Sequence, residues 1–185
     1  MADGSPKTDR ERKLDWLIDR AEIEDVLASY ARGIDRCDPQ VLKAVYHPHG
    51  YDEHGIFSGP GYGFADFIIP AMLANYITMQ HHFSTTSIDI RGHEASVESY
   101  FLCIMLANDR SLEFYGGRCL DHFEKIDGRW AIGHRQVVMD WTEVRRDVEL
   151  PPIDSLFLKG EWGDKDASYR LLPHLRLGAF LNQRH

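Results

Sequence analysis

Residues 94–126 read EASVESYFLCIMLANDRSLEFYGGRCLDHFEKI, and residues 127–142 continue with DGRWAIGHRQVVMDWT. Apolar and polar residues alternate here with a period of two, and aromatic and β-branched residues are frequent, as in strands that bury one face. Turn residues interrupt the alternation at Asn108-Asp109 and at Asp127-Gly128. The pattern predicts an antiparallel meander whose strands cover about 83–90, 94–107, 112–126 and 129–142.

The N-terminal half supplies helices that can cover such a sheet. Apolar residues recur at helical spacing from Leu14 to Ile34, and Asp38-Pro39 provides a capping carboxylate and a proline for a second, short helix over about 39–46. A short strand over 51–58 and a third helix over 62–79, which Pro70 is expected to kink or split, follow. Because long strands twist and curl, we expect an α+β fold: a cone-shaped curved antiparallel sheet (an α+β barrel) with three N-terminal helices enclosing a pocket.

Length and composition indicate one domain with tails. The chain has 185 residues, of which 43% are hydrophobic, enough for a substantial core. We expect a flexible tail over 1–12, the barrel domain over 13–144, and a C-terminal extension over 145–185 that packs on the barrel or on a neighbouring subunit.

The charge and the cysteines exclude several kinds of partner. A net charge of -8, with acids interspersed among the bases, argues against nucleic acid. Cys37, Cys103 and Cys119 have no CxxC spacing, so free thiols in a reducing compartment are expected. The N-terminus is polar, and no apolar run is long enough to span a membrane. We therefore expect a cytoplasmic protein without membrane contact.

Several local strings, in order along the chain, carry a family resemblance. They are YARGID at 30–35, MQHHF at 79–83, GGR at 116–118 and DHFE at 121–124. This order resembles the SnoaL-like branch of the nuclear transport factor 2-like superfamily, and in particular its dehydratases and dehydrochlorinases, such as bile acid 7α-dehydratase and scytalone dehydratase. Enzymes of that branch use a histidine paired with an aspartate as a general base and need neither a metal nor an organic cofactor.

The resemblance assigns roles to individual residues. Asp35 matches the family carboxylate, and His82 matches the family histidine better than His81 does, because the family histidine precedes an aromatic residue, a small residue and a threonine. Tyr30 stands where some members place a pocket Tyr or Lys, and Arg135 where some place an anion-stabilising Arg. We therefore expect Asp35 and His82 to meet in an enclosed pocket, with Tyr30 and Arg135 stabilising an oxyanion or a leaving group.

These residue types suit proton transfer. An imidazole titrates near neutral pH, and a carboxylate behind it fixes the tautomer and stabilises the imidazolium. Structural alternatives remain for each residue. Asp35 could cap its helix, His82 could be an ordinary barrel histidine, and Tyr30 could be core. Arg135 could pair with Asp121 or with Glu124 across the hairpin.

The substrate is expected to be a hydrophobic ring compound. Residues expected to line its pocket are Tyr51, His54, Phe57, Met105, Tyr115 and Trp141. A dense polar set from His47 to His54 straddles a loop and a strand, and we interpret it as solvated loop rather than as a metal site.

The function expected from these residues is a cofactor-independent lyase acting on aromatic or polycyclic molecules, by dehydration, related elimination or retro-aldol carbon–carbon cleavage. Alternatives are a polyketide cyclase or isomerase, a non-catalytic β subunit of a ring-hydroxylating dioxygenase, or a small-molecule binding module. The resemblance also implies a homo-oligomer, either a dimer or a trimer.

Overall fold

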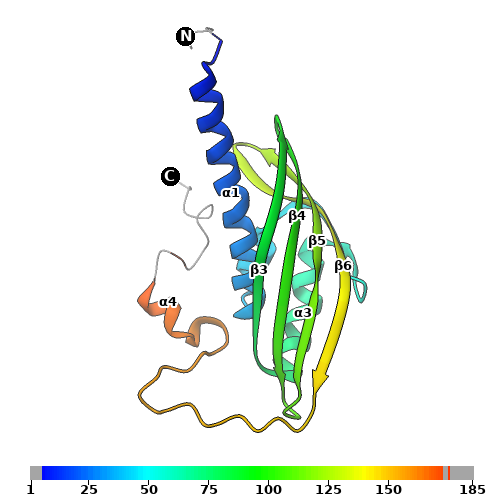
Figure 1. The fold of residues 1–185 in the computed structure, drawn as a ribbon, viewed down its shortest axis with the longest axis vertical. Coiled ribbons are helices and arrows are strands. Elements are labelled where there is room, and N and C mark those ends of the chain that lie inside the picture. The colour runs from blue at the N-terminus through cyan, green and yellow to red at the C-terminus, as the bar shows by residue number, and fades with distance from the viewer. Residues whose placement is uncertain (1–5, 173–174, 176–185) are drawn as a thin grey trace.

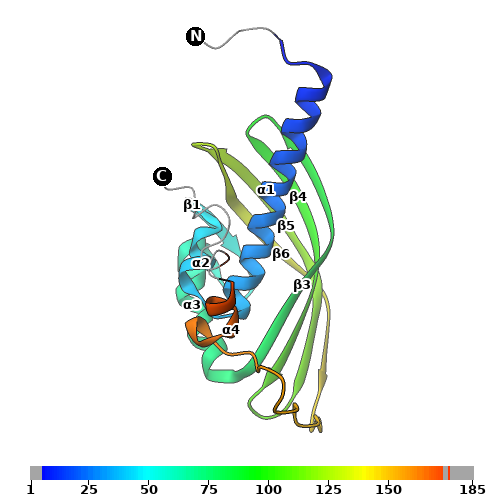
Figure 2. The same cartoon turned by 90° about the vertical axis from the view of Figure 1, so that its left-hand side faces the viewer.

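The computed structural model describes residues 6–172 and 175. In this part of the chain one curved sheet has helices packed against its concave face (Figures 1 and 2). Its strand order is β2-β1-β6-β5-β4-β3, so β2 and β3 are free edges and the sheet does not close into a barrel. The strands are β1 (Tyr46–Glu53), β2 (Ser58–Pro60), β3 (Tyr76–Arg91), β4 (Glu94–Ala107), β5 (Leu112–Ile126) and β6 (Arg129–Arg145).

The helices begin at capping residues that the sequence provides. A capping box of Thr8 and Glu11 begins α1 (Asp9–Asp35), and the Asp38 side chain accepts hydrogen bonds from two backbone amides at the start of α2 (Pro39–Ala44). Pro70 is accommodated inside α3 (Gly61–Asn75). The chain then returns after β6 to a 3₁₀ turn (Gly163–Lys165) and to α4 (Ala167–Leu171). No helix in residues 6–172 is long and apolar enough to cross a bilayer.

The predicted α+β class with a curved sheet is confirmed, and several boundaries are corrected. The predicted strands 94–107 and 112–126 have the observed bounds, whereas β3 begins at Tyr76, within the predicted third helix. The reason is tertiary: Tyr76 to His82 pairs with β4, which the local sequence does not reveal. The sheet is also not wholly antiparallel, because β1 pairs with β6 in parallel. The expected strand 51–58 is two strands, β1 and β2, and α1 begins inside the expected tail.

The hydrophobic core lies between the helices and the concave face. Its largest fully buried apolar side chains include Trp130, Phe123, Phe64, Ile23 and Met79. Residues directly opposite one another on neighbouring strands share a face, so register decides which side chains reach this interior.

One row of paired residues therefore lies beneath the helices, and the adjacent row faces away from them. His81, Cys103 and Tyr115 are in register across β3, β4 and β5, and the His81 ring contacts α1, which places this row on the helix-covered face. The next row, His82, Leu102, Gly116 and Trp141, must then lie on the opposite face.

The C-terminal segment docks on the end of α1 (Figure 2). The Arg36 Nη1 atom lies 3.1 Å from Asp166 Oδ2, and the Arg36 carbonyl accepts a hydrogen bond from the Gly163 amide. The Tyr169 hydroxyl donates to Asp38, and the Arg32 guanidinium lies 4.8 Å from the Tyr169 ring centroid. These contacts surround the C-terminal end of the helix that carries Asp35.

Candidate active site

The last residue of α1, Asp35, is bonded to one residue of β3, His81. The Asp35 Oδ1 atom lies 2.6 Å from His81 Nδ1, and the His81 backbone amide donates to both carboxylate oxygens at 3.1 and 2.9 Å. Because a carboxylate only accepts hydrogen bonds, Nδ1 carries a proton, and in the neutral ring Nε2 is the free nitrogen. No described residue hydrogen-bonds to Nε2. The side chains are 13% and 15% exposed, so the pair is largely buried yet open to solvent.

The expected contact between Asp35 and His82 is therefore wrong. His82 is exposed, and its Nε2 atom lies 3.3 Å from Gln80 Oε1 on the helix-free face. Strand alternation is the reason: only one of two adjacent histidines can point beneath α1, and the register of β3 selects His81.

The surroundings of His81 determine its charge. Burial lowers the pKa of its imidazole, but the nearby Cys103 sulfur, 3.8 Å from Nδ1, and the Asp35 carboxylate raise it by more, to about 10. At neutral pH the resting ring is thus an imidazolium held by Asp35. The neutral form that can accept a proton becomes more populated as the pH rises.

The expected polar partners Tyr30 and Arg135 are both buried deep in the cone. The Arg135 guanidinium lies 4.1 Å from the Tyr30 ring centroid, and its Nε and Nη2 atoms donate to the two Asp121 oxygens, each at 2.7 Å. Of the two cross-hairpin partners considered, Asp121 is the one observed. Among the described residues Arg135 Nη1 has no hydrogen-bond partner, although it is buried. The centroid of the Tyr30 ring lies 6.1 Å from that of Phe83, which is two residues after His81 on β3.

A comparison with family models matches residues 15–136 to the SnoaL-like domain. The chain belongs to the SnoaL-like family. Among solved structures, hexachlorocyclohexane dehydrochlorinase (LinA) Type2 has a TM-score of 0.70 at 17% identity, covering 77% of this chain and 99% of that one. A dehydrochlorinase of LinA-type3 from Novosphingobium barchaimii has a TM-score of 0.69 at 16% identity, covering 76% and 99%.

A proposed scytalone dehydratase from Novosphingobium aromaticivorans has a TM-score of 0.64 at 22% identity, covering 76% of this chain and 97% of that one. At these identities the structural likenesses establish the shared SnoaL-like fold. A search of curated proteins gave no match.

A second cluster of polar side chains in this SnoaL-like chain, formed by Tyr46, Asp52 and His54, was only partly predicted from the sequence. The Tyr46 hydroxyl donates to Asp52, which is fully buried, and His54 Nδ1 lies 3.0 Å from Asp52 Oδ1. The His54 ring stacks on Phe64 with centroids 4.4 Å apart. The alternation of β1 could have identified Asp52 as an inward residue, but its hydrogen bond with Tyr46 also depends on the irregularity of β1 between Tyr46 and Tyr51.

The six residues expected to line a pocket divide between the two faces. Met105 and Tyr115 lie on the helix-covered face near His81, whereas Phe57 packs with Phe64 and Phe67. His54 is bonded to Asp52, as described above. The expectation is wrong for Tyr51, whose hydroxyl lies 3.1 Å from Ser58 Oγ on the helix-free face, and for Trp141, which is 49% exposed on that face.

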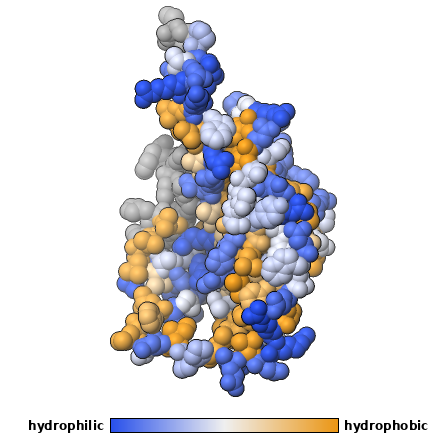
Figure 3. Space-filling model, in the orientation of Figure 1, coloured by the Kyte–Doolittle hydropathy of each residue, from blue (hydrophilic) through white to orange (hydrophobic). Residues whose placement is uncertain are grey.

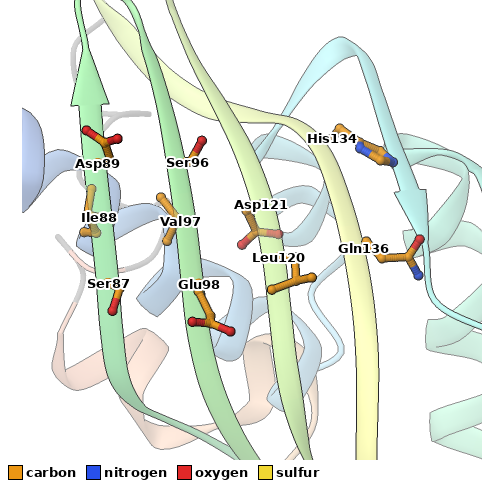
Figure 4. Close-up of a pocket in the computed structure, with 10 residues that line it drawn as sticks. All are labelled: Ser87, Ile88, Asp89, Ser96, Val97, Glu98, Leu120, Asp121, His134 and Gln136. Atoms are coloured by element: carbon orange, nitrogen blue, oxygen red, sulfur yellow. The ribbon is translucent and has the colours of Figure 1, made fainter.

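The helix-free face carries a shallow depression of about 530 Å³ (Figure 4). Polar side chains, among them Glu98, His134 and Gln136, surround Leu120 there. This depression is separated from the dyad by the sheet itself. In the described part of the chain, no three His, Cys, Asp or Glu side chains converge as metal ligands.

Proposed function

We propose that this SnoaL-like protein is a cofactor-independent lyase in which His81 is the general base and Asp35 orients it. The observation that carries the proposal is the 2.6 Å hydrogen bond between Asp35 Oδ1 and His81 Nδ1, which leaves Nε2 as the acceptor. The burial of most of both side chains strengthens the interaction between the imidazolium and the carboxylate.

The reaction class is an elimination from a carbon skeleton. His81 Nε2 removes a proton from the carbon next to the one that bears the leaving group, and the electrons of the broken C–H bond form the double bond. The leaving group departs with its own bonding pair, and the proton on Nε2 then passes to that group or to water. Tyr30 and the buried positive charge of Arg135 lie on the inner side of the dyad, where they can stabilise the developing anion.

The substrate class follows from the lining of the helix-covered face. Phe83 and Phe101 present rings 6.5 Å apart beside the dyad, and Met105 adds a thioether. Such a surface suits a hydrophobic aromatic or polycyclic molecule. The solved neighbours named as a hexachlorocyclohexane dehydrochlorinase and a proposed scytalone dehydratase are consistent with elimination from a ring.

The two adjacent histidines provide a matched test. The variants His81→Asn and His82→Asn are assayed against a panel of chlorinated and hydroxylated ring compounds, by chloride release or by the absorbance of the new double bond. We expect His81→Asn to lose about 10²–10⁴-fold in turnover and His82→Asn to stay within about twofold of the wild type. If only His82→Asn lost turnover, the base would be His82 on the helix-free face, and the proposal would be wrong. Unchanged affinity in His81→Asn without turnover in the wild type would indicate a binding module.

We further place the protein in the cytoplasm as a homo-oligomer. Cys37, Cys103 and Cys119 are free and buried, as suits a reducing compartment. The helix-free face exposes Tyr100 and Trp141, large side chains that a second subunit would cover.

A further inference from the structure

A second polar cluster lies on the helix-covered face, outside the dyad. Glu113 is on β5, and its Oε2 atom accepts two phenol hydrogen bonds, from Tyr115 at 2.6 Å and from Tyr76, at the start of β3, at 3.0 Å. All three side chains are partly buried. Burial raises the pKa of Tyr76 to about 12, and the Glu113 carboxylate raises it in the same direction. At neutral pH Tyr76 is thus a donor held on the carboxylate.

Register places this cluster beside His81. Cys103 pairs with His81 on one side and with Tyr115 on the other, so these side chains form one row on one face. Glu113 stands in the next inward row, opposite Met105. Two inter-strand spacings separate the His81 and Tyr115 backbones, about 10 Å, which is the reach of a small ring system.

The cluster has one unused acceptor. Both phenols donate to Oε2, and no described residue hydrogen-bonds to Glu113 Oε1. That oxygen is also not among the fully buried, unpartnered atoms, so solvent reaches it. A carboxylate can only accept hydrogen bonds, so the group that it selects must carry a donor.

We propose that Glu113, fixed by Tyr76 and Tyr115, binds a hydroxyl group of a ring-bearing substrate while His81 acts about one ring away. The inference deepens the proposed function, on which it rests, by naming a hydroxylated ring compound as the substrate class of that site. It also gives Tyr76 and Tyr115 a role as positioning residues, because neither phenol proton is free to reach the substrate.

The test compares two probes that differ by one donor. The full chain is titrated at pH 7 with 2-naphthol and with 2-methoxynaphthalene, and binding is followed by calorimetry. We expect the wild type to bind the naphthol at least about tenfold more tightly than the ether, as a hydrogen bond to a charged acceptor implies. The ratio of the two affinities is the measured quantity. In Glu113→Gln that ratio should fall to about twofold or less, because the acceptor loses its charge.

Glu143→Gln is the matched control. Glu143 pairs with Phe114, the neighbour of Glu113, and therefore lies on the opposite face, so its replacement should leave the ratio unchanged. Equal ratios in the wild type and Glu113→Gln, or an equal loss in Glu143→Gln, would overturn the assignment. If Glu113→Gln does not fold, Glu113→Asp keeps the charge but withdraws it by one methylene, so its ratio should fall clearly below that of the wild type, and an unchanged ratio would overturn the assignment.

The readout separates this inference from the lyase proposal. Binding of the probes requires no turnover, so His81→Asn should keep the wild-type naphthol ratio while it loses activity. If His81→Asn kept both the wild-type ratio of naphthol to ether affinity and full activity, the lyase proposal would be overturned and the role of Glu113 in binding would stand.

Discussion

Asp35 is the last residue of α1, where the partial negative charge of the helix dipole disfavours a negatively charged side chain. Its stability there comes from His81, which donates both its backbone amide and Nδ1. Burial lowers the pKa of the imidazole, but Cys103 and this contact with Asp35 together raise it by more. Structural stabilisation and the tuning of the base are therefore one interaction.

This coupling predicts an alkaline activity profile. A general base must be neutral, so kcat/KM should rise with pH through the raised pKa of free His81, above the ordinary value of 6.5. In Asp35→Asn the carboxylate no longer favours the imidazolium, so the ascending limb should move to lower pH while the plateau falls. The pH dependence of kcat/KM for both proteins measures this. A profile that falls with rising pH would instead make the imidazolium the active form.

The buried ion pair of Arg135 and Asp121 predicts a large effect on stability. Both side chains are fully buried, so Asp121→Asn would leave a guanidinium without its countercharge and should cost about 3–5 kcal/mol. Urea unfolding followed by circular dichroism measures the change. Asp140→Asn, at the exposed pair with Arg118, should cost less than about 1 kcal/mol. Similar losses in the two variants would mean that water compensates Arg135.

Residue identity at the site was predictable in kind but not in detail. The sequence indicated a histidine, Asp35, Tyr30 and Arg135, because their spacing resembles the family. The match to the family favoured His82, and this choice was wrong, since a one-residue change in register exchanges the two faces of a strand and the structure directs His81 toward Asp35. The partner of Arg135 and the cluster around Glu113 depend on register in the same way.

At the scale of elements, two parts of the chain contact the C-terminal end of α1, where Asp35 lies. The sheet supplies His81, and the C-terminal segment clamps the flanking residues Arg32 and Arg36. Asp166 organises that clamp by capping α4 and accepting from Arg36. Burial opposes its ionisation, but hydrogen bonds from Ser168 and the Glu161 amide hold the pKa of this carboxyl well below its usual range.

Loss of the clamp should free the preceding segment to move. We expect Asp166→Ala to cost roughly 1.5–3 kcal/mol for a charge-assisted contact and to speed chymotrypsin cleavage near Phe157, which is 70% exposed. The pKa of Asp166 is lower in the folded than in the unfolded protein. Its contribution to the free energy of unfolding is therefore fully present above the unfolded pKa and is lost as the pH falls toward the folded pKa, so wild type and variant should converge in acid. Asp164→Ala, an exposed neighbour, is the control. Equal cleavage rates in all three proteins would show that the clamp does not restrain the segment.

The elements themselves differed in how well the sequence predicted them. The bounds of β4 and β5 could be predicted because turn residues flank both strands. The boundary of α3 with β3 could not, since residues 76–79 are apolar enough for either state and only pairing with β4 makes them a strand. The parallel pairing of β1 with β6 is likewise a long-range feature.

At the scale of the whole molecule, the sheet separates two kinds of chemistry. Its concave face holds the dyad, the buried ion pair and the Glu113 cluster beneath the helices. Its other face is open to solvent, and hydrophobic surface gathers over the lower part of the strands and over the C-terminal segment on the same side (Figure 3). Register places Leu120, Tyr100 and Trp141 on this face, where they are 38%, 45% and 49% exposed.

Such a face predicts self-association. We expect the chain to be a dimer or trimer by light scattering, with a thermal midpoint that rises with protein concentration, because only the folded state is stabilised by assembly. Leu120→Glu places a charge in the centre of this face, beside Glu98, and should shift the protein toward the monomer by like-charge repulsion and lost apolar contact. Ile56→Glu, on the exposed turn that joins β1 and β2, should leave the mass unchanged. A wild-type monomer, or an unchanged mass in Leu120→Glu, would mean that subunits do not meet through this face.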